Sequence, residues 1–267
     1  MAKLSITSLK ERKKSGPKIT MVTAYDFPTA GLVDQVGIDL VLVGDSLGMV
    51  CLGYPDTVPV TMDEMVHHTA AVARANPSFL VVGDLPFLSY QVSEEDAVRN
   101  AGRLVKEGRA DCVKLEGGVT QADKVEAIVR AGMPVMGHIG LTPQTATQLG
   151  GFKVQGRDPR AARTLMEDAK AVEEAGAFAV VLECVPSALA TQMTEALSIP
   201  TIGIGAGPGC DGQVLVLHDL VGLYDRFTPK FVKKYANLSE EIRKALAAYK
   251  NEVESGAFPG PEHEYGG

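Results

Sequence analysis

The sequence predicts an α/β protein of one domain, a (β/α)8 barrel of the TIM type. Short apolar runs without polar alternation recur along the 267 residues, and such runs are typical of parallel strands covered on both faces. Helical patterns with start and stop signals separate most of the runs. Eight repeats of strand and helix joined by short turns favour a closed barrel. A doubly wound open sheet is the alternative architecture.

The elements are expected in a regular order. The strands should cover residues 19–24, 40–43, 79–82, 112–115, 135–137, 179–182, 201–204 and 214–217. Helix starts are signalled by a capping box at residues 61–64, by close variants at Ser93 and Thr120, and by Asp158 followed by proline. Four glycines stand where a helix ends in a left-handed residue: Gly37, Gly108, Gly132 and Gly176.

Three stretches depart from the repeat. Long loops are expected at residues 47–59 and 141–159, both on the C-terminal face of the barrel, and long loops in compact domains are usually functional. A C-terminal helical extension is expected at about residues 228–256. The apolar stripe of its last helix should pack on the barrel or on another subunit: Ile242, Leu246, Tyr249 and Val253.

Composition and charge narrow the class of protein. The net charge of −7 and the pI of about 5.3 argue against a nucleic acid or an anionic membrane as partner. Apolar runs fall short of the roughly 18 residues of a membrane span, and the N-terminus has no pattern of a secretory signal. The cysteines have no Cys-x-x-Cys pairing and indicate reduced thiols of a cytoplasmic protein: Cys51, Cys112, Cys184 and Cys210.

Polar side chains gather where the expected strands end, which in a barrel is one mouth. Each alone could simply cap the following helix. Several carboxylates facing one small space repel each other, however, and need a cation or raised pKa values. The strand-end residues are Tyr25 and Asp26, Asp45 and Ser46, Asp84, Lys114 and Glu116, His138, Glu183, the glycine-rich residues 205–207, and His218 and Asp219.

A magnesium site is the first expectation for this mouth. Asp45 and Asp84 should arrive at the same height on adjacent strands, each after a glycine. Hard carboxylate oxygens without paired His or Cys suit Mg²⁺, which accepts one or two protein carboxylates and keeps several waters. Glu116 should face the same side of its strand as Lys114 and is the third candidate ligand, directly or through water.

The other charged residues suggest chemistry on an anionic substrate. Lys114 would stabilise an anion or a developing enolate oxygen near the metal, although a local ion pair with Glu116 is the alternative. His138 should hydrogen-bond a bound carboxylate unless it is a satisfied core histidine. Glu183 ends an apolar run, and a carboxyl group in an apolar setting suits a general base or acid near neutral pH.

Two further patterns favour modest interpretations. Gly207, Gly209 and Gly212 match GxGxxG, but a strand is expected after them where a dinucleotide site needs a helix N-terminus. A flexible mouth loop that could lie against a cosubstrate is therefore expected. His67 and His68 should form a solvated or interface pair on a helix.

Together these motifs resemble the ketopantoate hydroxymethyltransferase family over residues 20–263. The resemblance rests on ungapped blocks in the family's order: TAYD at 23–26, VGDSLGM at 43–49, DLPF at 84–87, KLEGG at 114–118, GHIGLTPQ at 137–144, KVQGR at 153–157, LECVP at 182–186 and IGIGAG at 202–207.

This resemblance implies a Mg²⁺-dependent step of pantothenate biosynthesis. The one-carbon unit of 5,10-methylenetetrahydrofolate passes as a hydroxymethyl group to 3-methyl-2-oxobutanoate, giving 2-dehydropantoate and tetrahydrofolate. Family members are homo-oligomers, typically decamers. Carried over to this sequence, the resemblance implies that Asp45 and Asp84 bind the metal, with Glu116 in its shell. It implies that Ser46 and Lys114 contact the keto acid and that His138 lies near the substrate. Glu183 would be the proton acceptor.

Two other functions are alternatives. One is another Mg²⁺-dependent enolate enzyme acting on 2-keto acids, of the phosphoenolpyruvate mutase and isocitrate lyase type, which shares the Gly-Asp-Ser strand end. The isocitrate lyase signature Lys-Lys-Cys-Gly-His is absent from this sequence. The other is a non-catalytic metabolite-binding barrel, which predicts a broken set of acids, whereas the acids are all present here.

Overall fold

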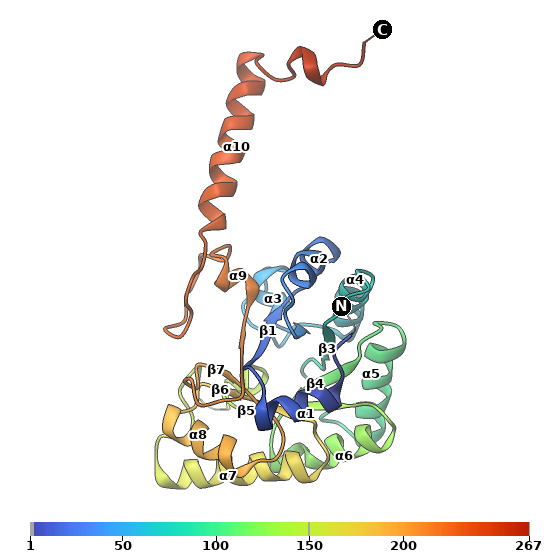
Figure 1. Ribbon diagram of the computed structural model, residues 1–267, viewed down its shortest axis with the longest axis vertical. Helices are drawn as coiled ribbons and strands as arrows, with labels where there is room; N and C mark the ends of the chain where they lie inside the picture. Colours follow the sequence, from blue (N-terminus) through green and yellow to red (C-terminus); the bar gives the residue numbers. More distant parts are fainter. Residues whose placement is uncertain (1–2, 149, 267) are drawn as a thin grey trace. The chain divides into compact units, whose positions relative to one another are not determined.

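A closed barrel of eight parallel strands forms the body of the protein (Figure 1). The computed structural model describes residues 3–148 and 150–266. Each strand pairs with the next in the chain, and β1 closes the barrel by pairing with β8. The predicted barrel is confirmed. The strands are β1 (Ile19–Thr23), β2 (Leu40–Val43), β3 (Leu80–Asp84), β4 (Cys112–Glu116), β5 (Val135–Gly140), β6 (Ala179–Glu183), β7 (Thr201–Ile204) and β8 (Gly212–Leu215).

Seven strands lie where the apolar runs predict them, but the eighth begins and ends two residues earlier than predicted. Gly212 and Gln213 pair with Ile19 and Thr20 of β1. The pairing uses only backbone groups, so the first half of β8 lacks the apolar signature of the other strands. The exposed Gln213 side chain donates instead to the carbonyl of Gly207 in the preceding loop, at 2.9 Å.

Helices lie around the outside of the barrel (Figure 1): α2 (Phe27–Gln35), α4 (Met62–Ala73), α5 (Glu94–Lys106), α6 (Ala122–Arg130), α7 (Pro159–Glu174) and α8 (Ser187–Ala196). The predicted starts at Thr61, Ser93 and Asp158 are confirmed, because each side chain accepts a hydrogen bond from the first helical turn. The start at Thr120 is wrong. Thr120 lies inside a 3₁₀ turn, η1 (Val119–Gln121), and α6 follows it directly.

Three of the four predicted helix-ending glycines have the expected left-handed backbone, with φ of 74° at Gly37, 90° at Gly132 and 96° at Gly176. Gly108 does not, and Arg109 takes the left-handed conformation instead, with φ of 60°. A Cβ at Gly108 would lie 2.6 Å from the carbonyl oxygen of Leu104. This glycine is therefore needed for a close approach and not for its backbone angle.

Helix α1 (Ile6–Ser15), which the sequence analysis did not predict, covers the end of the barrel where the strands begin. Its buried residue, Leu9, belongs to the apolar cluster inside the barrel. Arg12 pairs with Asp39 at 2.6 Å and Lys13 with Asp211 at 2.8 Å, and these aspartates directly precede β2 and β8. The helix therefore closes the barrel opposite to its mouth.

The two long loops contain short helical turns. The stretch at 47–59 begins with α3 (Leu47–Val50) and is irregular only afterwards. The stretch at 141–159 contains a 3₁₀ turn, η2 (Pro143–Thr145), and its residue 149 lies outside the described residues.

The chain divides into two compact units, Met1–Val216 with the barrel and Leu217–Gly267. The second unit contains α9 (Leu217–Leu220), α10 (Leu238–Ser255) and a 3₁₀ turn, η3 (Pro261–His263). Helix α10 matches the predicted last helix and ends at Gly256, whose φ is 74°. Its apolar stripe keeps 45–61% of its surface exposed. Among the described residues, the search for a long apolar helix that could cross a bilayer found none.

Candidate active site

The candidate site lies on the inner face of the barrel, at the ends of β3 to β6. Side chains alternate along a strand, so residues two apart face the same way. Val82 of β3 and Met136 of β5 belong to the apolar cluster inside the barrel. The inward positions that follow are charged: Asp84, Lys114 and Glu116, His138, and Glu183. The strand-end residues predicted from the sequence thus form a charged layer directly above the core.

Lys114 and Asp84 form a buried ion pair, with Nζ 2.7 Å from Oδ1 and side chains only 4% and 1% exposed. The alternative pairing of Lys114 with Glu116 is not formed. Burial raises the pKa of Asp84, and the Lys114 ammonium partly offsets that rise. Burial alone would lower the pKa of Lys114, but the surrounding carboxylates, Asp84 first, outweigh it and raise that pKa.

Asp45 stands beside Asp84 as predicted. Its backbone N–H donates to Asp84 Oδ2 at 3.2 Å, and its own Oδ2 accepts from Gln144 Nε2 at 2.9 Å. Asp45 does not cap helix α3, whose N-cap position is Ser46 without a side-chain cap bond. Burial raises the pKa of Asp45 well above its usual range, and the charges of Asp84 and Glu116 add to the rise. The close pair of acids therefore favours a bound cation.

The glycines that precede the two acids, Gly44 before Asp45 and Gly83 before Asp84, serve different purposes. A Cβ at Gly44 would lie 3.1 Å from Ser46 Oγ, so this glycine leaves room at the site. A Cβ at Gly83 would instead lie 3.3 Å from Leu104 of helix α5. Gly83 thus lets a helix pack on the outside of the barrel.

His138 lies between two glutamates. Its Nδ1 is 3.4 Å from Glu116 Oε1 and its Nε2 is 3.2 Å from Glu183 Oε2. Both contacts are within ion-pair distance, although neither has hydrogen-bond geometry among the described residues. Burial and Lys114 lower the pKa of His138, but the two glutamates outweigh them and raise it to about 9. The imidazole is therefore protonated near neutral pH. Glu183, 15% exposed, has this cation as neighbour and not the purely apolar setting that was expected.

The remaining strand-end residues have varied places. Tyr25 and Ser46 share a hydrogen bond of 2.9 Å between their hydroxyl groups. Asp26 caps helix α2 by accepting from the backbone of Thr29. His218 and Asp219 follow the end of β8 in helix α9 of the second unit, so they are not strand-end residues as predicted.

The predicted mouth loop and histidine pair also have defined structure. Residues 205–211 join β7 to β8, so a strand follows the GxGxxG pattern as expected. His67 and His68 pack edge to face, and His68 Nδ1 lies 2.7 Å from the carbonyl oxygen of Tyr25. His68 is therefore tied to the barrel and is not a freely solvated residue.

Two residues without a role in the sequence analysis complete the cluster. Gln144, in η2, bonds Asp45 through its side chain and Glu116 Oε2 through its backbone N–H, the latter at 3.1 Å. The Tyr90 hydroxyl lies 2.9 Å from both Gln144 Oε1 and the carbonyl oxygen of Glu116. Gln144 ends the block GHIGLTPQ, which was the one signal that pointed to it.

Comparison with known proteins identifies the family. The model of the family described as ketopantoate hydroxymethyltransferase matches residues 3–261. The chain belongs to this family. The resemblance seen in the sequence motifs is thereby confirmed, and with it the expectation that the chain is a hydroxymethyltransferase.

Curated relatives of this hydroxymethyltransferase are similar along almost their whole length. A 3-methyl-2-oxobutanoate hydroxymethyltransferase of Moorella thermoacetica is 63% identical over 264 residues, covering 99% of this chain and 98% of its own. The enzyme of the same name from Enterococcus faecalis is 62% identical, covering 98% of this chain and 96% of its own.

Solved structures of lower identity share the barrel. A phosphoenolpyruvate phosphomutase from Streptomyces platensis has a TM-score of 0.65 at 14% identity, covering 95% of this chain and 88% of its own. A phosphonopyruvate hydrolase in complex with oxalate and Mg²⁺ has a TM-score of 0.58 at 15% identity, covering 98% of this chain and 93% of its own. At these identities the similarities show a shared barrel fold.

The charge balance of the site fits a divalent cation. Four carboxylates, those of Asp45, Asp84, Glu116 and Glu183, face the two cations Lys114 and His138. A fully ionised cluster would carry two uncompensated negative charges. Among the described residues no three His, Cys, Asp or Glu side chains converge as a complete metal cage. Mg²⁺ bound by two carboxylates and completed by water and substrate oxygens needs no such cage.

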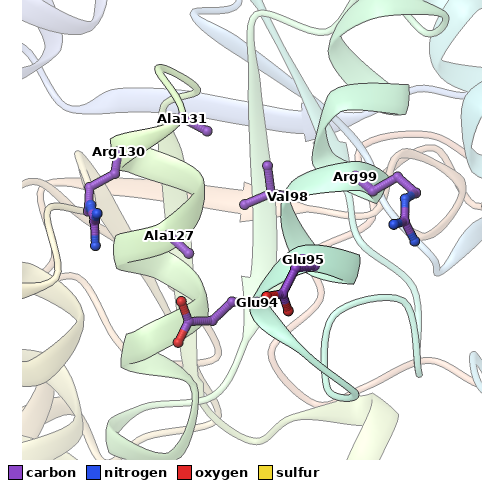
Figure 2. A pocket seen from close by; sticks show the side chains of 7 residues that line it. All are labelled: Glu94, Glu95, Val98, Arg99, Ala127, Arg130 and Ala131. Atoms are coloured by element: carbon purple, nitrogen blue, oxygen red, sulfur yellow. The ribbon is translucent and has the colours of Figure 1, made fainter.

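Two surface hollows lie apart from this cluster. One lies on the outside of the hydroxymethyltransferase barrel between α5 and α6, where Figure 2 shows side chains from both helices around it. Its lining consists of Glu94, Glu95, Val98, Arg99, Ala127, Arg130 and Ala131. These residues belong to the outer helices, so the hollow is separate from the strand ends.

Proposed function

We propose that the protein transfers a hydroxymethyl group from 5,10-methylenetetrahydrofolate to 3-methyl-2-oxobutanoate, giving 2-dehydropantoate and tetrahydrofolate. The observation that carries this proposal is the buried layer of ionisable groups at the barrel mouth, with paired acids beside a lysine and a glutamate beside a histidine. Its residues lie in the motifs of a family whose curated members bear the name of this activity.

Asp45 and Asp84 would hold Mg²⁺. Asp84 Oδ1 is bound to Lys114 and Asp84 Oδ2 to the Asp45 backbone, whereas Asp45 Oδ1 accepts no hydrogen bond from the residues that the structure describes. Glu116, whose two oxygens contact His138 and the Gln144 backbone, would belong to the metal's shell directly or through water. Bound Mg²⁺ would act as a Lewis acid on the keto acid and make its C3 proton removable.

Glu183 would accept the C3 proton at a carboxylate oxygen. His138 lies 3.2 Å from Glu183 Oε2 and would hold that carboxylate in place as a protonated neighbour. Lys114 would stabilise the negative charge that develops on the keto oxygen when the proton leaves, because a buried ammonium acts there without reorganisation of water. The carbanion carbon then forms a bond to the methylene carbon of the folate cosubstrate, and both C–N bonds of that carbon break in the course of the transfer. Water supplies the hydroxyl group, and the C3 proton and the remaining proton of water end on the two folate nitrogens.

Ser46 would bind the substrate carboxylate. Its hydroxyl, 2.9 Å from the Tyr25 hydroxyl, can donate to an anion while accepting from Tyr25. Together with Asp45, Asp84, Lys114 and His138 it would surround the keto acid on the substrate side of the cluster.

We further propose that the protein works in the cytoplasm as a homo-oligomer, a decamer by analogy with its family. The exposed apolar stripe of α10 supports this, because contiguous exposed apolar surface usually marks a contact with another subunit. We propose that the chain is a single barrel domain with a C-terminal helical extension at about residues 228–256, which falls within the second compact unit, Leu217–Gly267.

The test is tetrahydrofolate formation from 5,10-methylenetetrahydrofolate. The product should appear only when both 3-methyl-2-oxobutanoate and Mg²⁺ are present, and chelation of the metal should stop it. Cleavage of a carbon–carbon bond in isocitrate-like acids, without any folate turnover, would instead support a lyase of the phosphoenolpyruvate mutase and isocitrate lyase type.

A further inference from the structure

Gln144 is the most highly connected neutral side chain of the site. It lies in η2, after β5, and is 3% exposed. Its contacts reach Asp45 after β2, Leu85 after β3 and Glu116 at the end of β4. One residue of a loop thus connects the ends of three strands.

The orientation of its amide group is set at the NH₂ end, where both neighbours are acceptors, and Tyr90 and Gln91 can donate to the other end. Nε2 lies 2.9 Å from Asp45 Oδ2 and 2.9 Å from the carbonyl oxygen of Leu85, so both neighbours are acceptors and require the NH₂ end. Oε1 lies 2.9 Å from the Tyr90 hydroxyl, which can donate to it. With the amide turned over, two oxygens would face the amide oxygen without a proton between them.

This orientation determines which oxygen of Asp45 is left for a ligand. Oδ2 is held by the amide of Gln144, and Oδ1 accepts no hydrogen bond within the described part of the chain. The same residue steadies Glu116, because the Gln144 backbone N–H donates to Oε2 at 3.1 Å while the Tyr90 hydroxyl accepts from the Glu116 N–H at 3.2 Å. An amide does this without changing the charge of the acid cluster.

We propose that Gln144 is a positioning residue which, oriented by Tyr90, turns the Asp45 carboxylate so that Oδ1 meets the divalent cation. The inference rests on the proposed function, since the cation is the Mg²⁺ of that reaction. Partners that orient metal ligands in this way typically contribute 10–100-fold to metal affinity. Tyr90 acts on the metal ligand only through the amide and through Glu116.

The experiment measures Mn²⁺ binding to the full chain by electron paramagnetic resonance, without substrates, so that the readout does not depend on turnover. In Gln144→Met the dissociation constant of Mn²⁺ should rise about 10–100-fold. Tyr90→Phe should weaken binding less but in the same direction. The double variant should lose less affinity than the product of the two single losses, because Tyr90 acts in part through the Gln144 amide. Gln192→Met, at an exposed position of α8, is the matched control and should bind as the wild type does.

The melting temperature of each variant shows whether weaker Mn²⁺ binding comes from lost positioning of the ligand or from a destabilised fold. Mn²⁺ binding by Gln144→Met as tight as in the wild type would overturn the proposal. If Gln144→Met fails to fold, Tyr90→Phe decides, and unchanged affinity in that variant has the same meaning. A wild-type protein that binds no Mn²⁺ would overturn the proposed metal site as well, whereas tight wild-type binding with unaffected variants overturns only the role of Gln144.

Discussion

Replacing Lys114 by methionine should destabilise the barrel in a strongly pH-dependent way. The change leaves the Asp84 carboxylate, 1% exposed, without its cation at 2.7 Å. Two unit charges at this distance attract by about 6 kcal/mol at an effective dielectric constant of about 20. Removing one partner of a buried pair costs about 3–5 kcal/mol in practice. We expect about 3 kcal/mol at pH 8, because Asp84 can limit the loss by taking up a proton.

The pH dependence follows from the direction of the Asp84 shift. Burial already raises the pKa of Asp84 and Lys114 restrains it, so without Lys114 that pKa rises further. A carboxyl group with a raised pKa in the folded state costs no stability below its unfolded pKa of about 3.9, and the cost grows as the pH rises toward the folded pKa. The deficit of Lys114→Met should therefore be smaller at pH 5 than at pH 8.

Urea unfolding and thermal melting of the metal-free protein at both pH values measure this. A loss of about 3 kcal/mol corresponds to a melting temperature lower by about 6–12 °C for a chain of this size. Adding Asp84→Asn should restore stability to Lys114→Met, because the unpaired charge is then gone. A deficit under about 1 kcal/mol at pH 8, or a double variant less stable than Lys114→Met, would refute the reasoning.

Three further outcomes are expected. Glu183→Gln should slow exchange of the C3 proton of the keto acid in deuterated water by about 100-fold or more, as followed by NMR, with keto-acid binding retained; unchanged exchange would show that Glu183 is not the base. Asp45→Ala and Asp84→Ala should each weaken Mg²⁺-dependent keto-acid binding in calorimetric titrations by at least about tenfold, and normal titrations would contradict the ligand assignment. Asp34 accepts from the backbone and hydroxyl of Ser78 at 2.7 Å, and these bonds, the hydroxyl first, lower its pKa. The stabilisation of the fold by the Asp34 carboxylate is therefore present above about pH 4 and lost in acid. Asp34→Asn should reduce the free energy of unfolding, measured in urea, by about 1 kcal/mol at pH 7 and by much less at pH 3. An equal difference at both pH values would argue against it.

The barrel was predictable because its strands are covered on both faces and read as apolar runs. The prediction failed where backbone geometry decided the outcome. Gly212 and Gln213 join β8 through backbone pairing alone. Helix α1 carries one buried side chain, Leu9, in a segment otherwise rich in charge, so it has almost no apolar period to detect. Arg109 replaces the expected glycine as the left-handed residue.

The composition of the site was predictable in the same way, and its connections were not. Strand-end position and the period of two bring Asp84, Lys114 and His138 to one layer. Which acid pairs with Lys114 depends on the relative height of adjacent strands, and the register aligns Asp84 with Lys114 directly. Gln144 enters from a loop, where no period links sequence position to direction, so its bond to Asp45 could not be foreseen.

The charged layer rests on the core without a separating layer. Val82, Met136 and Val181 each stand two residues before a charged group and face the same way. Protein interiors are packed as densely as crystals of small organic molecules. Removing a methylene group from the core would therefore displace the charged side chains that lie on it. The apolar side chains inside this barrel therefore also set the positions of the reactive groups. Substitutions that change the core packing to raise thermal stability would shift these groups as well.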